Sequence, residues 1–226
     1  MTPAERQIPL WVKLAYTAFC AVLIPIYLRD YGPTNFLYFC DVALLMTLVA
    51  VWTERPIWAS MPAVGIFLPQ SRWMVDFLAE CVGLHVTSMT GYMFDKSIPL
   101  LTRGLSLFHF WLPIMLVWLV ARLGYDRRAF RNWTLLAWAL ILVCYFFMPA
   151  PPAPSANPNQ PTNINYVYGF NKAGPQIVLP PLAYLGALMV VLPSCIFWPT
   201  HWALNRIWGG GADDRKKNDE ARMTKE

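Results

Sequence analysis

Long apolar runs, separated by short polar or proline-containing turns, recur along most of the chain. A helix needs about twenty mostly apolar residues to cross a bilayer. Seven segments approach or fit this pattern: Leu10–Leu28, Asn35–Trp52, Ile57–Pro69, Arg72–Phe94, Leu100–Leu123, Trp133–Met148 and Leu179–Trp208. We therefore expect an all-α, polytopic integral membrane bundle of about seven transmembrane segments. The short segment Ile57–Pro69 either spans the membrane or is re-entrant.

The composition argues against the soluble classes of protein. Hydrophobic residues make up 57% of the 226 residues and charged residues 14%, against about 25% charged residues in an average soluble domain. A soluble domain of this length cannot hide so much apolar surface in its core. A soluble enzyme, a disordered chain and a nucleic-acid-binding domain are thus disfavoured. The expected partners are membrane lipids and other membrane proteins, with no nucleic acid.

The charges predict how the chain is organised. Residues 1–208 form the expected transmembrane domain, and residues 149–178 form an extracytoplasmic loop rich in proline and asparagine. Residues 209–226 are expected to be a disordered, charged cytoplasmic tail. Arginines between residues 122 and 131 place that loop in the cytoplasm by the positive-inside rule. The side of the N-terminus stays open, because it depends on whether Ile57–Pro69 spans.

Ionisable groups inside membrane helices are costly and are therefore functional candidates. Asp76, Glu80 and His85 fall within one predicted helix, Arg72–Phe94, and form a polar intramembrane stripe. Asp76 and Glu80 lie four residues apart, on one helix face, so we expect the two carboxylates to share a proton. The stripe is either a proton or cation path, a metal site, or a face that hydrogen-bonds to neighbouring helices.

A cysteine and a histidine on separate predicted helices suggest covalent chemistry. Cys40 lies early in one helix, beside Asp41, and His109 lies early in a later one. A cysteine thiolate activated by a histidine base is a nucleophile–base pair suited to acyl transfer. We predict Cys40, His109 and Asp41 as the catalytic group. The chain has no recognised metal-ligand spacing and no cofactor-binding motif, so no metal and no cofactor are expected.

The loop before the last predicted helix contains a cluster of asparagine and tyrosine residues. These are Asn163, Asn165, Tyr166 and Tyr168, which follow a proline-rich stretch. Proline-rich sequence favours an extended path over a helix. The loop is either a solvent-exposed linker or a lid over a substrate cavity, in which case these four residues would contact the substrate.

Three motifs in this order resemble the YwaF-like integral membrane family: Phe39–Leu45, His109 and Asn163–Tyr168. That family is distantly related to androgen-induced membrane lipid hydrolases and to a transmembrane phospholipid acyltransferase. Other stretches resemble bacterial proteins known only as membrane-associated: Asp76-Phe77, Tyr92–Asp95, Gly104–His109 and Leu123–Arg128. The resemblance implies a bacterial cytoplasmic membrane location. It also implies a catalytic cysteine and histidine, at positions similar to Cys40 and His109.

Three functions remain open from the sequence. The leading hypothesis is a thiol-dependent lipid acyltransferase or hydrolase that uses Cys40 as nucleophile and His109 as base. The second is a non-catalytic subunit or scaffold of a membrane complex. The third is a proton-coupled transporter in which Asp76 and Glu80 relay protons.

Overall fold

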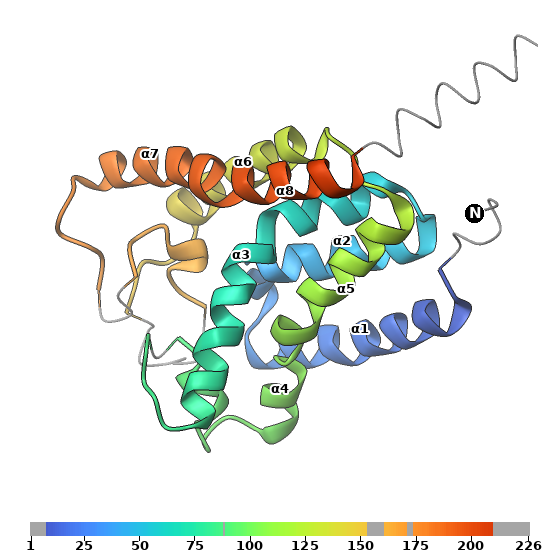
Figure 1. Ribbon diagram of the computed structural model, residues 1–226. Coiled ribbons are helices and arrows are strands. Elements are labelled where there is room, and N and C mark those ends of the chain that lie inside the picture. Colours follow the sequence, from blue (N-terminus) through green and yellow to red (C-terminus); the bar gives the residue numbers. More distant parts are fainter. Residues whose placement is uncertain (1–7, 88, 153–160, 171–173, 210–226) are drawn as a thin grey trace, which may run out of the picture.

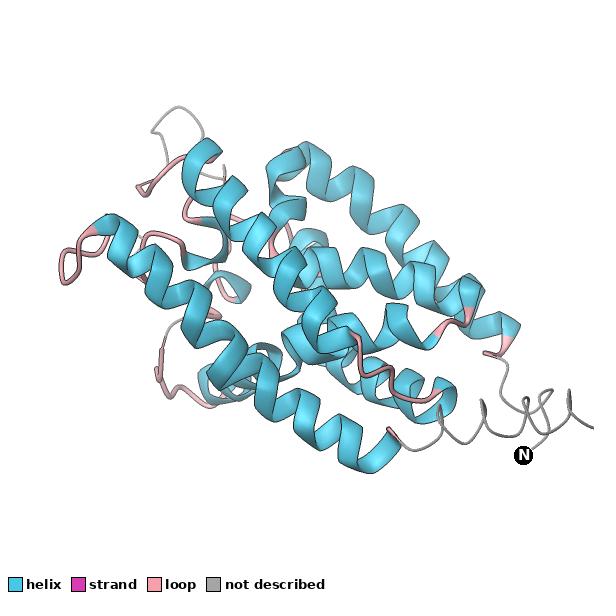
Figure 2. Ribbon diagram, turned by 90° about the horizontal axis from the view of Figure 1, so that it is seen from above, coloured by secondary structure: helices cyan, strands magenta, loops and turns pink. Residues whose placement is uncertain are grey.

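The computed structural model describes residues 8–87, 89–152, 161–170 and 174–209. Within these ranges the chain contains helices and loops and no strand, which confirms the all-α class (Figure 2). The α-helices are α1 (Leu10–Asp30), α2 (Phe39–Thr53), α3 (Pro56–Cys81), α4 (Leu100–Leu105), α5 (Phe108–Leu123), α6 (Ala129–Phe147), α7 (Pro181–Val191) and α8 (Trp198–Trp208). The shorter segments are η2 (Pro33–Leu37), η3 (Gly91–Met93), η4 (Ile164–Tyr166) and the π-helical η5 (Leu192–Phe197).

The helices run back and forth between two ends of the bundle (Figure 1). At one end, which we call the basic end, Lys13 of α1 forms an ion pair of 2.6 Å with Glu54 in the turn after α2. The Asp126 amide, between α5 and α6, donates to Ser60 Oγ of α3 at 3.0 Å at this same end. At the other end, the loop end, Thr102 of α4 donates to Asp30 of α1 at 2.7 Å.

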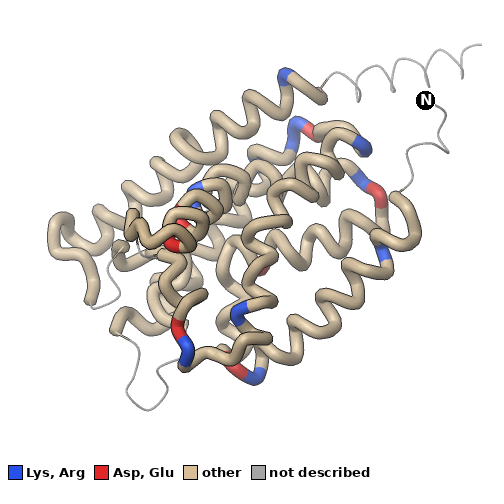
Figure 3. The backbone as a smooth tube through the Cα atoms, turned by 60° about the horizontal axis from the view of Figure 1, so that its bottom comes forward, with Lys and Arg blue, Asp and Glu red and all other residues tan. Residues whose placement is uncertain are grey.

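Most charged residues lie toward the ends of the helices, and the lengths between them are largely uncharged (Figure 3). Four helices are long and apolar enough to cross a membrane: Leu10–Asp30, Leu100–Leu123 (α4 and α5 together), Ala129–Phe147 and Pro181–Trp208. Helix α2 is apolar but shorter. These helices make the chain compatible with a membrane, whereas the predicted count of seven spans is not confirmed.

Helix α3 corrects two sequence predictions at once. The segments Ile57–Pro69 and Arg72–Phe94 are not two helices, because α3 runs without a break from Pro56 to Cys81. Pro62 and Pro69 lie inside it, and a proline that removes one backbone donor often bends a helix without ending it. Figure 1 shows the bend in α3.

The predicted extension of this helix to Phe94 is also wrong. Helix α3 ends at Cys81, and Gly83 follows with a φ of 80°. That left-handed conformation costs glycine little and terminates helices. The described residues from 82 to 99 form the α3–α4 loop, which contains only the short η3. His85 therefore lies in a loop and not on a membrane helix.

The core of the bundle is built around α3, which packs against α2, α5, α6 and α8. Its residues from Ala59 to Ile66 are all buried. Gly65 lies directly against the indole ring of Trp133 of α6, and Trp133 is fully buried. The absent side chain at position 65 is what lets α3 and α6 approach so closely.

The π-helical segment η5 is held by a side chain from a neighbouring helix. Pro193 has no backbone N–H, so the carbonyl of Met189, four residues earlier, cannot receive the usual helical hydrogen bond. Trp138 of α6 supplies the missing donor, because its Nε1 donates to the Met189 carbonyl at 2.8 Å. This bond ties α6 to the junction between α7 and α8.

The variant Trp138→Phe keeps an aromatic ring but removes this donor. We expect it to lower the free energy of unfolding by about 1 kcal/mol, the net contribution of one hydrogen bond. Trp202→Phe is the matched control, since Trp202 is mostly exposed on α8. Thermal unfolding in detergent measures both variants, and equal melting temperatures would contradict the assigned role of Trp138.

Candidate functional site

Cys40 and Asp41 lie in the first turn of α2, at the loop end of the bundle. The Cys40 thiol donates to Asp41 Oδ2 at 3.5 Å. Asp41 is 2% exposed, and its second oxygen, Oδ1, has no hydrogen-bond partner among the described residues. The thiol thus contacts a carboxylate whose other oxygen is free to receive a donor.

His109 lies in the first turn of α5. Its backbone amide donates to the Ser106 carbonyl at 3.1 Å, and its ring lies 5.1 Å from that of Trp73 on α3. The Nδ1 atom of His109 is buried and has no partner within the described chain. The hydrogen bond that the structure gives Cys40 goes to Asp41 and not to His109, so the pairing of Cys40 with His109 stays a prediction.

Two further polar groups with unpartnered atoms come from α3. Gln70 and Trp73 are both buried, and Gln70 Oε1 and Trp73 Nε1 find no hydrogen-bond partner in the described residues. Residues three apart share one helix face. Since α2 and α3 are joined by the short turn at 54–55, Asp41 on α2 and Gln70 on α3 lie at similar heights in the bundle.

These four residues form what we call the unpartnered cluster: Asp41, Gln70, Trp73 and His109. They come from three helices that pack on one another, with α3 in contact with both α2 and α5. Their free atoms include acceptors on Asp41 and Gln70, a donor on Trp73 and a histidine nitrogen. Such a set suits a ligand that both donates and accepts hydrogen bonds.

Tyrosine side chains border this region. The Tyr27 hydroxyl of α1 shares a hydrogen bond of 2.8 Å with Ser106 Oγ. Tyr92, in the α3–α4 loop, lies near Ser106, Trp73 and Cys40, and its burial raises the pKa of its phenol well above the ordinary value. Tyr92 therefore stays a neutral hydrogen-bonding group at neutral pH.

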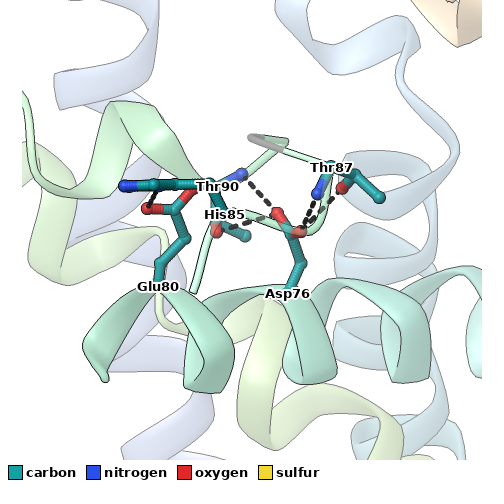
Figure 4. A network of polar contacts seen from close by, with 5 residues as sticks. All are labelled: Asp76, Glu80, His85, Thr87 and Thr90. Atoms are coloured by element: carbon teal, nitrogen blue, oxygen red, sulfur yellow. Dashed lines mark hydrogen bonds and ion pairs between the residues drawn. The ribbon is translucent and has the colours of Figure 1, made fainter. Parts of the chain in front are cut away.

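Asp76 has a different role from the one predicted for the polar stripe (Figure 4). Its Oδ1 accepts hydrogen bonds from the amide and hydroxyl of Thr87, at 2.9 and 2.7 Å. Its Oδ2 accepts two more from Thr90, both at 3.0 Å. The carboxylate thus clamps the α3–α4 loop onto the end of α3.

Glu80 and His85 form a separate contact at the end of α3. Glu80 Oε2 lies 2.9 Å from His85 Nδ1, and the His85 side chain is 70% exposed (Figure 4). The expectation that Asp76 and Glu80 share a proton is wrong, because both oxygens of Asp76 accept hydrogen bonds from the loop and Glu80 Oε2 contacts His85. The three residues therefore do not form one stripe along a membrane helix.

The residues predicted to form a lid are packed into the protein. Asn165 Oδ1 accepts from the Phe39 amide of α2 at 3.0 Å, and its Nδ2 donates to the Leu37 carbonyl at 2.9 Å. Asn163 binds the backbone of the same loop, donating to the Gly169 carbonyl and accepting from the Tyr168 amide at 2.8 Å.

The tyrosines of this loop also make backbone contacts. The Tyr168 hydroxyl donates to the Tyr145 carbonyl of α6 at 2.7 Å, and the Tyr166 carbonyl accepts from the Tyr184 hydroxyl of α7 at 3.1 Å. The described loop residues 161–170 thus join α2, α6 and α7. Of the predicted proline-rich loop, residues 153–160 and 171–173 lie outside the described residues, as does the predicted tail from 210 onward.

Comparison with known proteins adds no relative. A scan against protein-family models, a search of curated proteins and a search of solved structures each found no match. The resemblance to the YwaF-like family stays a prediction, and the function is inferred from the geometry of this site.

Sequence reasoning missed Gln70, Trp73 and Tyr92 as members of the site. Gln70 fell in the gap between two predicted helices, and Tyr92 was placed on a helix that does not extend so far. A polar residue in an apolar stretch was the available signal for Gln70. This signal can be interpreted only once α3 is known to be continuous, because a glutamine buried in the middle of a helix requires a hydrogen-bond partner.

The variant Asp76→Ala tests the clamp. Thr90 is fully buried, so its amide and hydroxyl lose their acceptor, and we expect a loss of about 2–3 kcal/mol in the free energy of unfolding. Hydrogen exchange of the Thr87 and Thr90 amides should accelerate. The control is Asp95→Ala, which removes an exposed carboxylate of the same loop that accepts from Ser97 at 2.8 Å. Unchanged exchange in the Asp76 variant would contradict the clamp.

Proposed function

We propose that this protein is an integral membrane enzyme that transfers or hydrolyses acyl groups of lipids through the thiol of Cys40. The observation that carries the proposal is the unpartnered cluster, in which Asp41 contacts the Cys40 thiol. A buried polar atom without a hydrogen bond costs about 1–3 kcal/mol. Four such residues on three packed helices, one of them in contact with the Cys40 thiol, are best explained by a ligand that supplies their partners.

The surroundings of the site suit a lipid substrate. The four membrane-compatible helices expose large apolar side chains on their outer faces, among them Leu14, Val22, Ile114, Phe146 and Val190. A phospholipid in the surrounding bilayer carries ester carbonyls, which accept hydrogen bonds, next to a polar headgroup. Its acyl chains would stay in the bilayer while the ester reaches the cluster.

Each catalytic residue has a defined task in the proposed reaction. Asp41 accepts the hydrogen bond of the Cys40 thiol and orients it, and His109 acts as the base that removes the thiol proton. The sulfur attacks the ester carbonyl carbon and forms a thioester, and the C–O bond of the ester breaks. The leaving oxygen takes the proton from His109. Water or an acceptor hydroxyl then attacks the thioester and restores the thiol.

The distribution of charge supports an orientation in the membrane. The basic end carries Lys13, Arg55, Arg122, Arg127, Arg128, Arg131 and Arg206, and the loop end carries Arg29, Arg72, Lys96 and Arg103. The positive-inside rule then places the basic end in the cytoplasm. The proposed site would face the extracytoplasmic leaflet of a bacterial cytoplasmic membrane, with the C-terminus inside.

The test uses the full chain, purified and reconstituted in vesicles of mixed phospholipids. Mass spectrometry of the lipids is expected to show released fatty acid or exchanged acyl chains with the wild type. Cys40→Ala should abolish this change, and His109→Ala should reduce it about 10²–10⁴-fold, the usual contribution of a general base.

The matched control is Cys195→Ala, which removes an exposed thiol on η5 that lies far along the chain from the site. It should keep wild-type activity. If the wild type leaves every lipid unchanged, the proposal fails and the scaffold hypothesis takes its place. If folded Cys40→Ala remains active, the assignment of the nucleophile is wrong.

A further inference from the structure

An apolar groove lies on the outer surface between α6 and the continuous helical run α7–η5–α8. Its volume is about 410 Å³. The walls are mainly large apolar side chains: Phe130, Trp138, Met189, Val190, Pro193 and Trp198. Ser194 is also in the lining, but its hydroxyl donates to the Val190 carbonyl at 2.7 Å and is therefore occupied. The groove thus offers an apolar contact surface and little hydrogen-bonding capacity.

The walls of the groove are held in place by contacts within the protein. The bond from Trp138 to the Met189 carbonyl fixes one part of the groove. Toward the basic end, the rings of Phe130 and Trp198 pack edge to face, 5.7 Å apart. The groove is therefore preformed and does not depend on a bound molecule for its shape. Val190 and Trp198 are 66% and 51% exposed, so the groove is open to its surroundings.

Among the described residues, positive charge lies beside one end of this groove. Arg131 is exposed and directly follows Phe130, a wall residue, in the first turn of α6. Trp138, at the other end of the groove, lies eight residues after Phe130, or about 12 Å along the helix. Arg127 and Arg128 precede the same helix, Arg127 in a hydrogen bond with Asn205 and Arg128 paired with Asp126.

We infer that this groove binds one acyl chain of an anionic phospholipid, whose phosphate lies at Arg131. The apolar groove matches the acyl chain of such a lipid, and the cations at the level of the headgroups match its phosphate. A zwitterionic lipid would fill the groove equally well, but its binding would gain less free energy from the positive charge. The proposed site lies at the basic end and uses none of the residues of the proposed acyl chemistry, so the two proposals can fail separately.

The experiment measures which lipid the purified full chain retains. The protein is reconstituted with equal amounts of phosphatidylglycerol and phosphatidylcholine, extracted in mild detergent and weighed intact by native mass spectrometry. We expect phosphatidylglycerol to be retained in preference to phosphatidylcholine. Arg131→Gln should lower that preference about fivefold, the contribution of one arginine near a charged lipid surface.

A second variant tests the groove itself. Val190→Trp places an indole in the open groove and should abolish retention of the lipid. The controls are Leu182→Trp, on an exposed part of α7 that is not among the wall residues, and Lys96→Gln, at the loop end. Both controls should retain lipid as the wild type does. Equal retention of the two lipids by the wild type, or unchanged retention in either test variant, would overturn the inference.

Discussion

The variant Gly65→Ala is expected to lower the free energy of unfolding by about 3 kcal/mol or more, at the upper end of the cost of overpacking a core. For a chain of this length, that corresponds to a fall of about 10 °C in the melting temperature. A methyl group at position 65 would overlap the indole ring of Trp133, which is fully buried between α3 and α6. The ring cannot move aside without displacing other core residues.

The predicted loss of stability is opposite in sign to the usual effect of replacing glycine by alanine in a helix. Alanine usually stabilises a helix relative to glycine, by about 1 kcal/mol. Gly186→Ala on α7 is the control, because a methyl group there meets no described atom within 4 Å. It should be neutral or stabilising. In the background of Trp133→Leu, the change Gly65→Ala should cost much less, and a coupling near zero would contradict the proposed contact.

Replacing Asn165 should give the second large loss of stability. The side chain pairs with the Phe39 amide, the Leu37 carbonyl and, at 3.6 Å, the Cys144 sulfur. Its φ is 56°, a left-handed conformation that asparagine tolerates better than a branched apolar residue. We expect Asn165→Leu to cost about 3 kcal/mol, since it leaves the Phe39 amide and the Leu37 carbonyl without their partners and puts an apolar side chain at a positive φ.

A second substitution separates the contribution of the backbone conformation to stability from that of the side-chain hydrogen bonds. Asn165→Gly accepts the left-handed conformation but lacks the side chain, so it should recover only a part of the lost stability. Phe170→Leu, an exposed change in the same loop, serves as the control. Because Phe39 precedes Cys40, the Asn165 variants should also reduce any activity that depends on Cys40. If Asn165→Leu has the same melting temperature as the wild type, this account is contradicted.

The helical class and most helix positions could be predicted from the sequence, because long apolar runs removed from water strongly favour a helix over other backbone structures. The predicted segment Leu100–Leu123 covers α4 and α5, and Leu179–Trp208 covers α7, η5 and α8. The main error came at Pro69, where the predicted segment Ile57–Pro69 ended although α3 continues through it. Whether a proline ends a helix or bends it depends on the neighbours that pack around it, and the sequence of the segment does not contain that information.

The site was only partly accessible to sequence reasoning, for a related reason. Asp41 and His109 stood out as ionisable residues in apolar segments, and the structure places both among the buried groups with unpartnered atoms. Asp76 stood out equally, yet its carboxylate is occupied by Thr87 and Thr90. A polar residue in an apolar segment of the sequence indicates a side chain that needs a hydrogen-bond partner. Only the fold shows whether the protein itself supplies that partner.

The most direct test of the central claim is the mass of the Cys40 peptide after brief contact with phospholipid. The full chain is mixed with phospholipid vesicles, quenched in acid, digested and analysed for acyl adducts that hydroxylamine removes. We predict an acyl group on Cys40, with Cys81 and Cys195 unmodified, and its loss in the His109→Ala variant. Lipid turnover with no acyl group on Cys40, or equal labelling of all three cysteines, would contradict a covalent mechanism at this site.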